Sequence, residues 1–111
     1  MNESMKEVYK YIDDNADRFV EDLRRLCRQP SVSARHESIE ECAELIKTMM
    51  EDVGVEANIV STEGHPVVLG EQRFRGAART IGFYNHYDVQ PPEPLDLWET
   101  PPFSADMRER G

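Results

Sequence analysis

The sequence predicts an α/β fold built in layers, with helices packed on a sheet. Two segments near the N-terminus repeat apolar residues at helical spacing, and three shorter strand-like segments follow them. A Pro-rich stretch then indicates a long ordered loop. With 111 residues the chain is one domain, or part of a larger one, and it can bury only a modest core.

The first predicted helix runs from Met5 to about Gln29 and ends before Pro30, which cannot continue it. Arginines gather in its last turns, where they lie favourably against the negative end of the helix dipole. The apolar face that predicts the helix consists of Val8, Ile12, Phe19, Leu23 and Leu26.

A short connector leads to the second predicted helix, which runs from about Glu37 to Val53. Ser38 and Glu41 have the spacing of a capping box at its start, and Gly54 is suited to end it. Its apolar stripe consists of Ile39, Cys42, Ile46, Met49 and Val53.

Cys27 and Cys42 are the only cysteines in the chain, and each lies on the apolar face of a predicted helix. We expect both to be buried free thiols that pack like small apolar residues. A disulfide between them is the alternative that the sequence leaves open. Neither has the strand-to-helix or helix N-terminal position that favours a nucleophilic thiolate.

Strand-like patterns follow Gly54. The segment Val55 to Ser61 alternates apolar and polar residues, and Val67 to about Phe74 is a second strand candidate, so that the two predict a hairpin. Arg79 to Asn85 is the third and most apolar strand, which we expect to be buried. Phe103 to Arg108 resembles the beginning of one more strand.

The charge balance excludes several function classes. The net charge is −9, with acidic residues in both halves of the chain, whereas a surface that binds nucleic acid needs a basic patch. No apolar run approaches the length of a membrane span, and the N-terminal segment lacks the apolar core of a signal peptide. We therefore expect a cytoplasmic protein with neither nucleic acid nor membrane as a partner.

A histidine and an aspartate, His86 and Asp88, stand two residues apart directly after the third predicted strand. Residues two apart in an extended chain point to the same side, and open α/β sheets bind ligands at strand ends. A metal-binding histidine commonly donates its second ring N–H to a carboxylate, so the pair offers a candidate ligand and a candidate orienting group. The competing interpretation is a pair that only bonds to backbone. His36 and His65 lie in polar turns and are expected at the surface.

A longer motif surrounds this pair. It runs from Asn85 to Pro91 with the sequence Asn-His-Tyr-Asp-Val-Gln-Pro, and Leu97-Trp98 and Pro102-Phe103 follow. The motif resembles the carnosinase-like dipeptidase branch of the zinc aminoacylase and carboxypeptidase-G metallopeptidases. Acetylornithine deacetylase and succinyl-diaminopimelate desuccinylase belong to the same superfamily. The first helix and the segment 28–33 also resemble the start of that family, so the likeness covers nearly the whole chain.

The resemblance implies a fold and a domain organisation. Residues 1–111 would be the N-terminal portion of a layered catalytic domain, with helices packed on a mixed sheet in the phosphorylase/hydrolase-like architecture of zinc exopeptidases. The rest of that domain, and the family's lid or dimerisation domain, are then expected outside this chain. The full-length protein would be a candidate homodimer.

The resemblance also implies a chemistry. Family members bind two divalent ions, usually zinc, although cobalt and manganese suit similar ligands. His86 matches the first metal-binding histidine, and Asp88 matches the acid of the catalytic set that orients it. The remaining ligands and the general-base glutamate would lie beyond Gly111. The activity implied is hydrolysis of an amide bond in a dipeptide or an N-acyl amino acid by an activated water.

Three hypotheses follow from the sequence. The first is a metal-dependent amide hydrolase, active as the full-length protein and inactive as this chain alone. The second is a non-catalytic scaffold or interaction module that keeps the fold. The third is a small acidic α/β protein, against which the exposed last strand and the Pro-rich loop count. The substrate, the physiological metal and the oligomeric state are not determined by the sequence.

Overall fold

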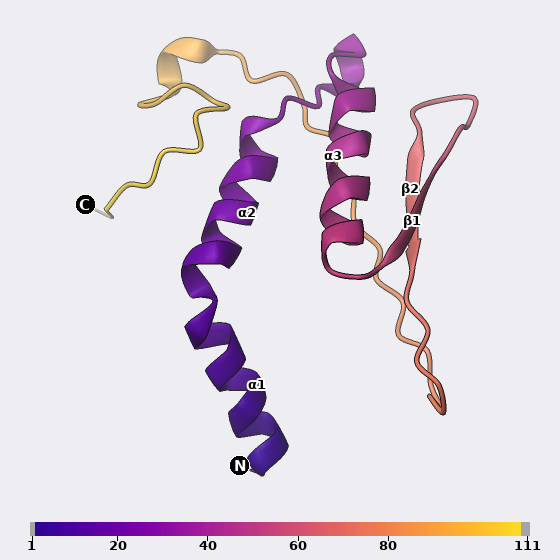
Figure 1. Cartoon of the computed structure of the whole chain (residues 1–111). Coiled ribbons are helices and arrows are strands. Elements are labelled where there is room, and N and C mark those ends of the chain that lie inside the picture. Colours follow the sequence, from indigo (N-terminus) through magenta and orange to yellow (C-terminus); the bar gives the residue numbers. More distant parts are fainter. Residues whose placement is uncertain (1, 110–111) are drawn as a thin grey trace.

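The computed structural model describes residues 2–109. Its first predicted helix forms as two helices in line, α1 (Glu3–Asp14) and α2 (Ala16–Arg28), with an interruption at Asn15 (Figure 1). The side-chain amide of Asn15 donates a hydrogen bond to the Tyr11 carbonyl, and its side-chain oxygen accepts one from Arg18. Such local bonds compete with the regular helix pattern, which accounts for the break that apolar periodicity alone does not predict. Asn2 caps α1 by accepting a hydrogen bond from the Met5 backbone N–H.

The second predicted helix forms as α3 (Ile39–Asp52), but its predicted capping box is wrong. Ser38 has left-handed backbone angles and its side chain makes no capping hydrogen bond. A capping serine needs extended backbone for its oxygen to reach the first free N–H groups, so the spacing to Glu41 alone is not sufficient. The predicted stop at Gly54 is confirmed, since Gly54 has a φ of 85° and its N–H bonds to the Glu51 carbonyl.

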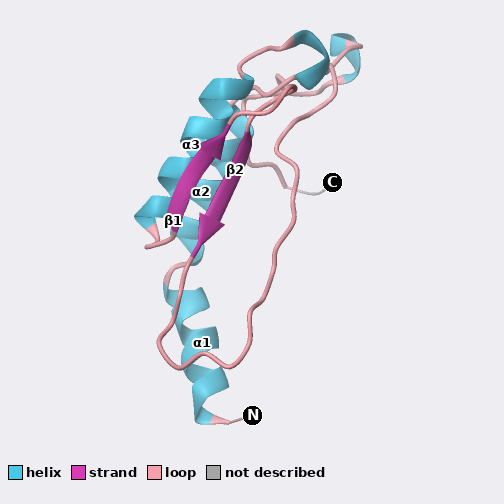
Figure 2. Cartoon of the chain, turned by 90° about the vertical axis from the view of Figure 1, so that its right-hand side faces the viewer, coloured by secondary structure: helices cyan, strands magenta, loops and turns pink. Residues whose placement is uncertain are grey.

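The predicted hairpin is confirmed. Strands β1 (Glu56–Val60) and β2 (Val67–Glu71) pair antiparallel, with Ala57 opposite Gly70 and Ile59 opposite Val68. Figure 2 shows the hairpin lying along α3. Both strands contact that helix, and α2 contacts it as well. The small core consists of Val32, Ile39, Cys42, Ala43 and Ala57.

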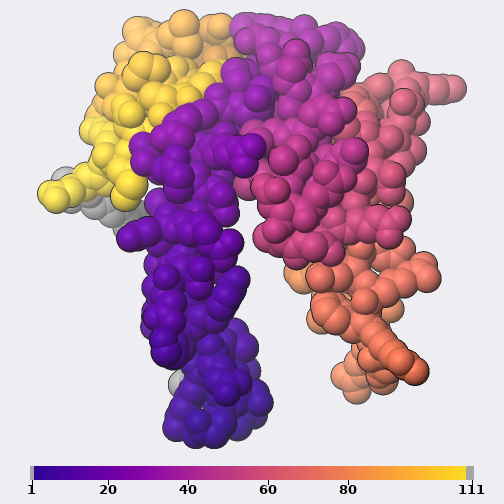
Figure 3. All heavy atoms as spheres, in the orientation of Figure 1, coloured from indigo at the N-terminus to yellow at the C-terminus, as the bar shows by residue number. Residues whose placement is uncertain are grey.

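The prediction of a third, buried strand over Arg79 to Asn85 is wrong for this structure. The segment has no strand assignment, and Ile81, Phe83 and Tyr84 are 78%, 87% and 95% exposed. A strand requires ladder hydrogen bonds from a neighbour, and the described residues 2–109 place no strand beside it. The two-stranded antiparallel sheet also stands in place of the predicted mixed sheet. In Figure 3 the segment that follows the hairpin projects away from the body of the molecule.

The Pro-rich segment is an ordered loop, as predicted, and carries the 3-10 turn η2 (Leu95–Leu97). The Trp98 ring nitrogen donates a hydrogen bond to the Pro92 carbonyl at 2.8 Å, which fastens the loop to itself. The further strand predicted from Phe103 is wrong, because Ser104 closes a turn onto the Pro101 carbonyl. Among the described residues, no helix is long and apolar enough to cross a membrane.

Candidate functional site

The motif His86-Tyr87-Asp88 lies against the connector between α2 and α3 rather than at the end of a formed strand. Val89 pairs in parallel with Val32 of that connector. The Val89 N–H donates to the Ser31 carbonyl at 2.9 Å, and the Ser33 N–H donates to the Val89 carbonyl at 3.3 Å. Val32 is fully buried, so the motif rests directly on the core of the chain.

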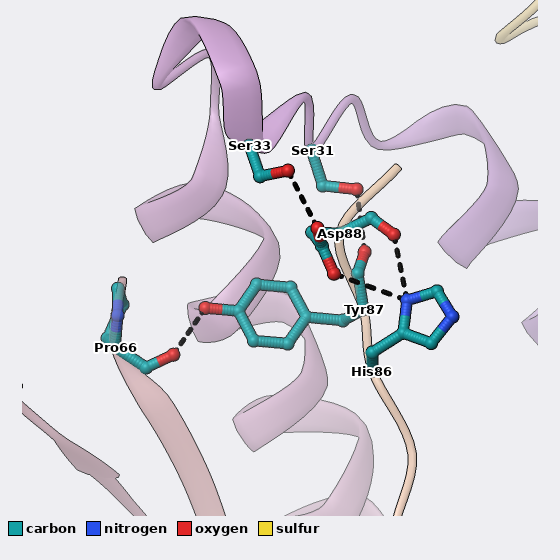
Figure 4. Close-up of polar contacts among 6 residues, drawn as sticks. All are labelled: Ser31, Ser33, Pro66, His86, Tyr87 and Asp88. Carbon is teal, nitrogen blue, oxygen red and sulfur yellow. Dashed lines mark hydrogen bonds and ion pairs between the residues drawn. The ribbon is translucent and has the colours of Figure 1, made fainter. Parts of the chain in front are cut away.

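His86 and Asp88 are in contact, as their spacing predicts (Figure 4). The ring nitrogen Nδ1 of His86 lies 3.0 Å from the Asp88 carbonyl oxygen and 3.2 Å from Asp88 Oδ1. Both neighbours are acceptors, so a neutral ring carries its proton on Nδ1. Its other nitrogen, Nε2, then presents a lone pair, and Figure 4 shows that nitrogen facing away from Asp88. The His86 side chain is 79% exposed, which leaves Nε2 open to a ligand.

The carboxylate of Asp88 is shared between two partners. Its Oδ2 accepts a hydrogen bond from Ser33 Oγ at 2.6 Å, while its Oδ1 faces His86. The Ser33 hydrogen bond is the largest cause that lowers the pKa of Asp88 from its ordinary value of 3.8. Burial opposes it with a smaller effect, and the hydrogen bond with His86 lowers the pKa further. Asp88 is therefore a carboxylate at neutral pH, which is the form that accepts both bonds.

Tyr87, the middle residue of the motif, bonds to two other segments of the chain. Its carbonyl accepts a hydrogen bond from Ser31 Oγ at 2.7 Å, and its hydroxyl donates to the Pro66 carbonyl at 2.5 Å. Burial raises the pKa of the Tyr87 phenol from its ordinary value of 10.0, so the hydroxyl stays protonated and able to donate. The motif is thus tied both to the connector and to the turn of the hairpin.

The chemistry of His86 fits a divalent metal ion of the zinc type. A neutral imidazole with a free Nε2 and a bonded Nδ1 is the usual state of a metal-binding histidine. Within residues 2–109, no group of three or more His, Cys, Asp or Glu side chains lies close enough together to hold a metal. His86 and Asp88 by themselves therefore do not make a closed metal site.

The remaining histidines lie near the site but do not extend it. His36 is exposed, as expected, whereas His65, for which a surface position is also expected, is half-buried. The two ring centroids lie 4.7 Å apart. His65 Nε2 lies 3.0 Å from the Ser33 carbonyl oxygen, which it serves as a donor. His65 therefore stabilises the connector and does not contribute a second ligand beside His86.

The two cysteines are both free thiols, as predicted, but only one is buried. Burial raises the pKa of the Cys42 thiol, which behaves as a small core residue. The expectation that Cys27 is buried is wrong, because the Pro-rich loop that faces it leaves an open groove between them. Cys27 borders an open groove of about 580 Å³, whose wall includes four prolines together with Leu97, Trp98 and Phe103.

Ser31 and Ser33 contact the motif through hydrogen bonds that the sequence patterns do not predict. Neither stands in a nucleophile motif, and their connector has no regular periodicity. The one available signal is their alternation around Val32, because in an extended chain it places both hydroxyls on the same side.

Comparison with known proteins places this geometry in context. No protein-family model matches the chain. The Cys-Gly metallodipeptidase dug1 of Schizosaccharomyces pombe is 30% identical over 124 aligned positions, which cover 100% of this chain and 26% of that protein. The Cys-Gly metallodipeptidase DUG1 of Saccharomyces cerevisiae is 27% identical over 125 positions, with 98% and 26% covered.

A solved structure agrees with these relatives. The M20 family metallo-carboxypeptidase Sso-CP2 from Sulfolobus solfataricus superposes with a TM-score of 0.72 and 42% sequence identity. The match covers 78% of this chain and 20% of that one. The chain thus spans about a quarter of the length of the curated relatives that it matches. On the evidence of both sequence and fold, this chain is a homologue of the M20 metallopeptidases.

Proposed function

We propose that this chain supplies His86, a metal ligand, and Asp88, its orienting carboxylate, to a two-metal hydrolase of amide bonds. The substrates are dipeptides or N-acyl amino acids, in keeping with the relatives named as dipeptidases. The observation that carries the proposal is the geometry of His86, whose Nδ1 is occupied by Asp88 while Nε2 faces outward.

Each residue has a defined role in this proposal. His86 holds a divalent ion, zinc in the first instance, through Nε2. Asp88 fixes the tautomer and the direction of the ring and makes the imidazole a stronger ligand. When bound, the metal ions polarise the amide carbonyl and make a water molecule a better nucleophile at neutral pH.

The proposal also assigns the chain to one part of a catalytic domain. The relatives are about four times as long as the region that matches this chain. The accessible surface of the structure is 9506 Å², about half again the roughly 6,300 Å² expected for a folded monomer of 12.8 kDa. Both facts support a piece whose apolar faces are covered by further parts of the same domain.

The first test replaces the ligand in a polypeptide that contains the complete catalytic domain. With zinc supplied, His86→Ala should lower kcat/KM for dipeptides by more than about 100-fold, because loss of even a supporting group costs about 10–100-fold. His36→Ala, which removes an exposed histidine nearby, is the matched control and should retain activity. Unchanged hydrolysis by His86→Ala would remove His86 from the site. Zinc binding without hydrolysis in the unmodified polypeptide would favour the scaffold hypothesis.

The second test uses the 111-residue chain alone. We expect no hydrolysis of dipeptides and only weak zinc binding, because one ligand and an orienting group do not close a site. Calorimetric titration with zinc, with His86→Ala as the reference, measures the affinity. Dipeptide cleavage that a chelator abolishes, observed with the purified chain, would contradict this expectation.

A further inference from the structure

Asp88 is held by a residue 55 positions earlier in the chain. Ser33 Oγ donates to Asp88 Oδ2 at 2.6 Å, and the opposite carboxylate oxygen faces His86 Nδ1 at 3.2 Å. Figure 4 shows the three side chains in one line, from the connector through the carboxylate to the imidazole. The Ser33 hydroxyl thus contacts the motif at the Asp88 carboxylate, the group that orients His86.

The connector that carries Ser33 is a support that backbone hydrogen bonds tie to the motif. Its backbone pairs with Val89 on both sides of the buried Val32. Arg35, two residues further on, forms an ion pair with Glu93 at 2.7 Å across the same junction. A hydroxyl on such a support has a fixed position relative to the motif, whereas one on a free loop would not.

We propose that Ser33 is a positioning residue that fixes the Nδ1–H tautomer of His86 through the carboxylate of Asp88. This inference rests on the proposed function in one respect: the Nδ1–H tautomer matters because it leaves Nε2 free to bind a metal. A carboxylate held at one oxygen cannot rotate freely about its side-chain bonds, so its second oxygen stays within reach of Nδ1. Without Ser33, His86 keeps only the carbonyl of Asp88 as a fixed acceptor.

Ser31 provides an internal comparison. Its hydroxyl lies in the same connector and donates at 2.7 Å, but to the backbone carbonyl of Tyr87 rather than to the carboxylate. Ser31 is 3% exposed, so removal of its hydroxyl disturbs the connector at least as much as removal of that of Ser33. A purely structural effect should therefore be seen in both variants, and a positioning effect only in Ser33 variants.

The experiment measures the tautomer of His86 directly by long-range ¹H–¹⁵N NMR on the labelled 111-residue chain. Spectra are compared at the same alkaline pH, and the ¹⁵N shifts of the two ring nitrogens identify which one carries the proton. The unmodified chain should show the Nδ1–H form. Ser33→Ala and Ser33→Val should shift the tautomer ratio about five-fold toward Nε2–H, the change that one net hydrogen bond of about 1 kcal/mol produces.

Two controls complete the design. Ser33→Thr retains a hydroxyl, is isosteric with Ser33→Val, and should restore the Nδ1–H form. Ser31→Ala should leave the tautomer ratio unchanged. The methyl resonances of Val32 and Ile39, which are fully buried, report whether each variant keeps its fold.

The outcomes separate this inference from the proposed function. An Nε2–H ring in the unmodified chain, or the same ratio in Ser33→Val and Ser33→Thr, overturns the role of Ser33. A shifted ratio in Ser33→Val supports it, even if His86→Ala in the complete catalytic domain retains activity and the proposed function fails.

Discussion

At the scale of single residues, Tyr87 shows how the motif is supported from both sides. Its carbonyl bonds to the connector and its hydroxyl to the turn at Pro66, while the Nε2 of its neighbour His86 faces away from Asp88 (Figure 4). The phenol donates this hydrogen bond only when protonated. Burial raises its pKa and so keeps it protonated, because the charged form would lose its hydration.

A pH dependence of stability follows from Tyr87. A raised pKa means that the folded state keeps its proton longer than the unfolded state, so this contribution is present below about pH 10 and is lost as pH rises through the folded value. In urea titrations, the free energy of unfolding should fall between about pH 9 and pH 11 more in the unmodified chain than in Tyr87→Phe. Tyr84→Phe, at a side chain that is 95% exposed, should behave like the unmodified chain. Equal slopes for all three proteins would show that Tyr87 does not contribute.

At the scale of elements, the hairpin and α3 approach closely at Gly70. A Cβ atom built on Gly70 would lie 2.8 Å from Met50 Sδ of the helix and 2.9 Å from Val55 Cγ1. Real Cβ atoms do not approach other atoms so closely, so glycine allows the strand to lie against α3. Gly82, in the exposed segment, has no atom within 4 Å of such a Cβ.

Alanine should therefore affect stability differently at these two glycines. Gly70→Ala should lower the free energy of unfolding by about 1 kcal/mol, since overpacking costs about 1–3 kcal/mol and the flexible Met50 relieves part of it. Gly82→Ala should be neutral or stabilising by up to about 1 kcal/mol, because it restricts the unfolded chain without a clash. Thermal unfolding followed by circular dichroism distinguishes the two. A Gly70→Ala variant as stable as the unmodified chain would mean that the strand does not press on the helix.

At the scale of the whole molecule, the chain is open. Its radius of gyration is 17.3 Å, whereas a compact domain of 111 residues has about 13 Å. Two parts stand away from the core, namely α1, which buries no residue, and the segment around residue 80 (Figure 3). Within residues 2–109, no backbone hydrogen bond pairs the segment 79–85 with another part of the chain. Its exposed apolar side chains and free backbone groups form a surface suited to strand pairing.

Self-association of the isolated chain should therefore depend on this segment. Phe83→Glu places a charge in the exposed apolar run and should lower the self-association measured by light scattering at increasing protein concentration. Met107→Glu changes the net charge equally at another exposed apolar position and is the matched control. If both variants scatter alike, charge alone is responsible and the segment is not the associating surface.

The local signals in the sequence predict much of this structure correctly. Helical periodicity predicts α2 and α3, Gly54 predicts the end of α3, and the turn between two alternating segments predicts the hairpin. The capping box at Ser38 fails because a cap depends on backbone angles that spacing does not reveal. The prediction of a third strand is wrong because a strand forms only beside a hydrogen-bonded neighbour. Apolar composition indicates that a segment tends to be buried, but not which strand would pair with it.

For the candidate site, the sequence by itself determined the pair His86 and Asp88, the family that they resemble and the contact that their spacing favours. The tertiary structure decided which ring nitrogen is occupied and which groups hold the carboxylate, because the pairing of the connector with Val89 places Ser33 beside Asp88. It also decided that Arg79 to Asn85 lies exposed. Spacing along the chain governs contacts between near residues, whereas contacts over 55 positions depend on how the core brings two segments together.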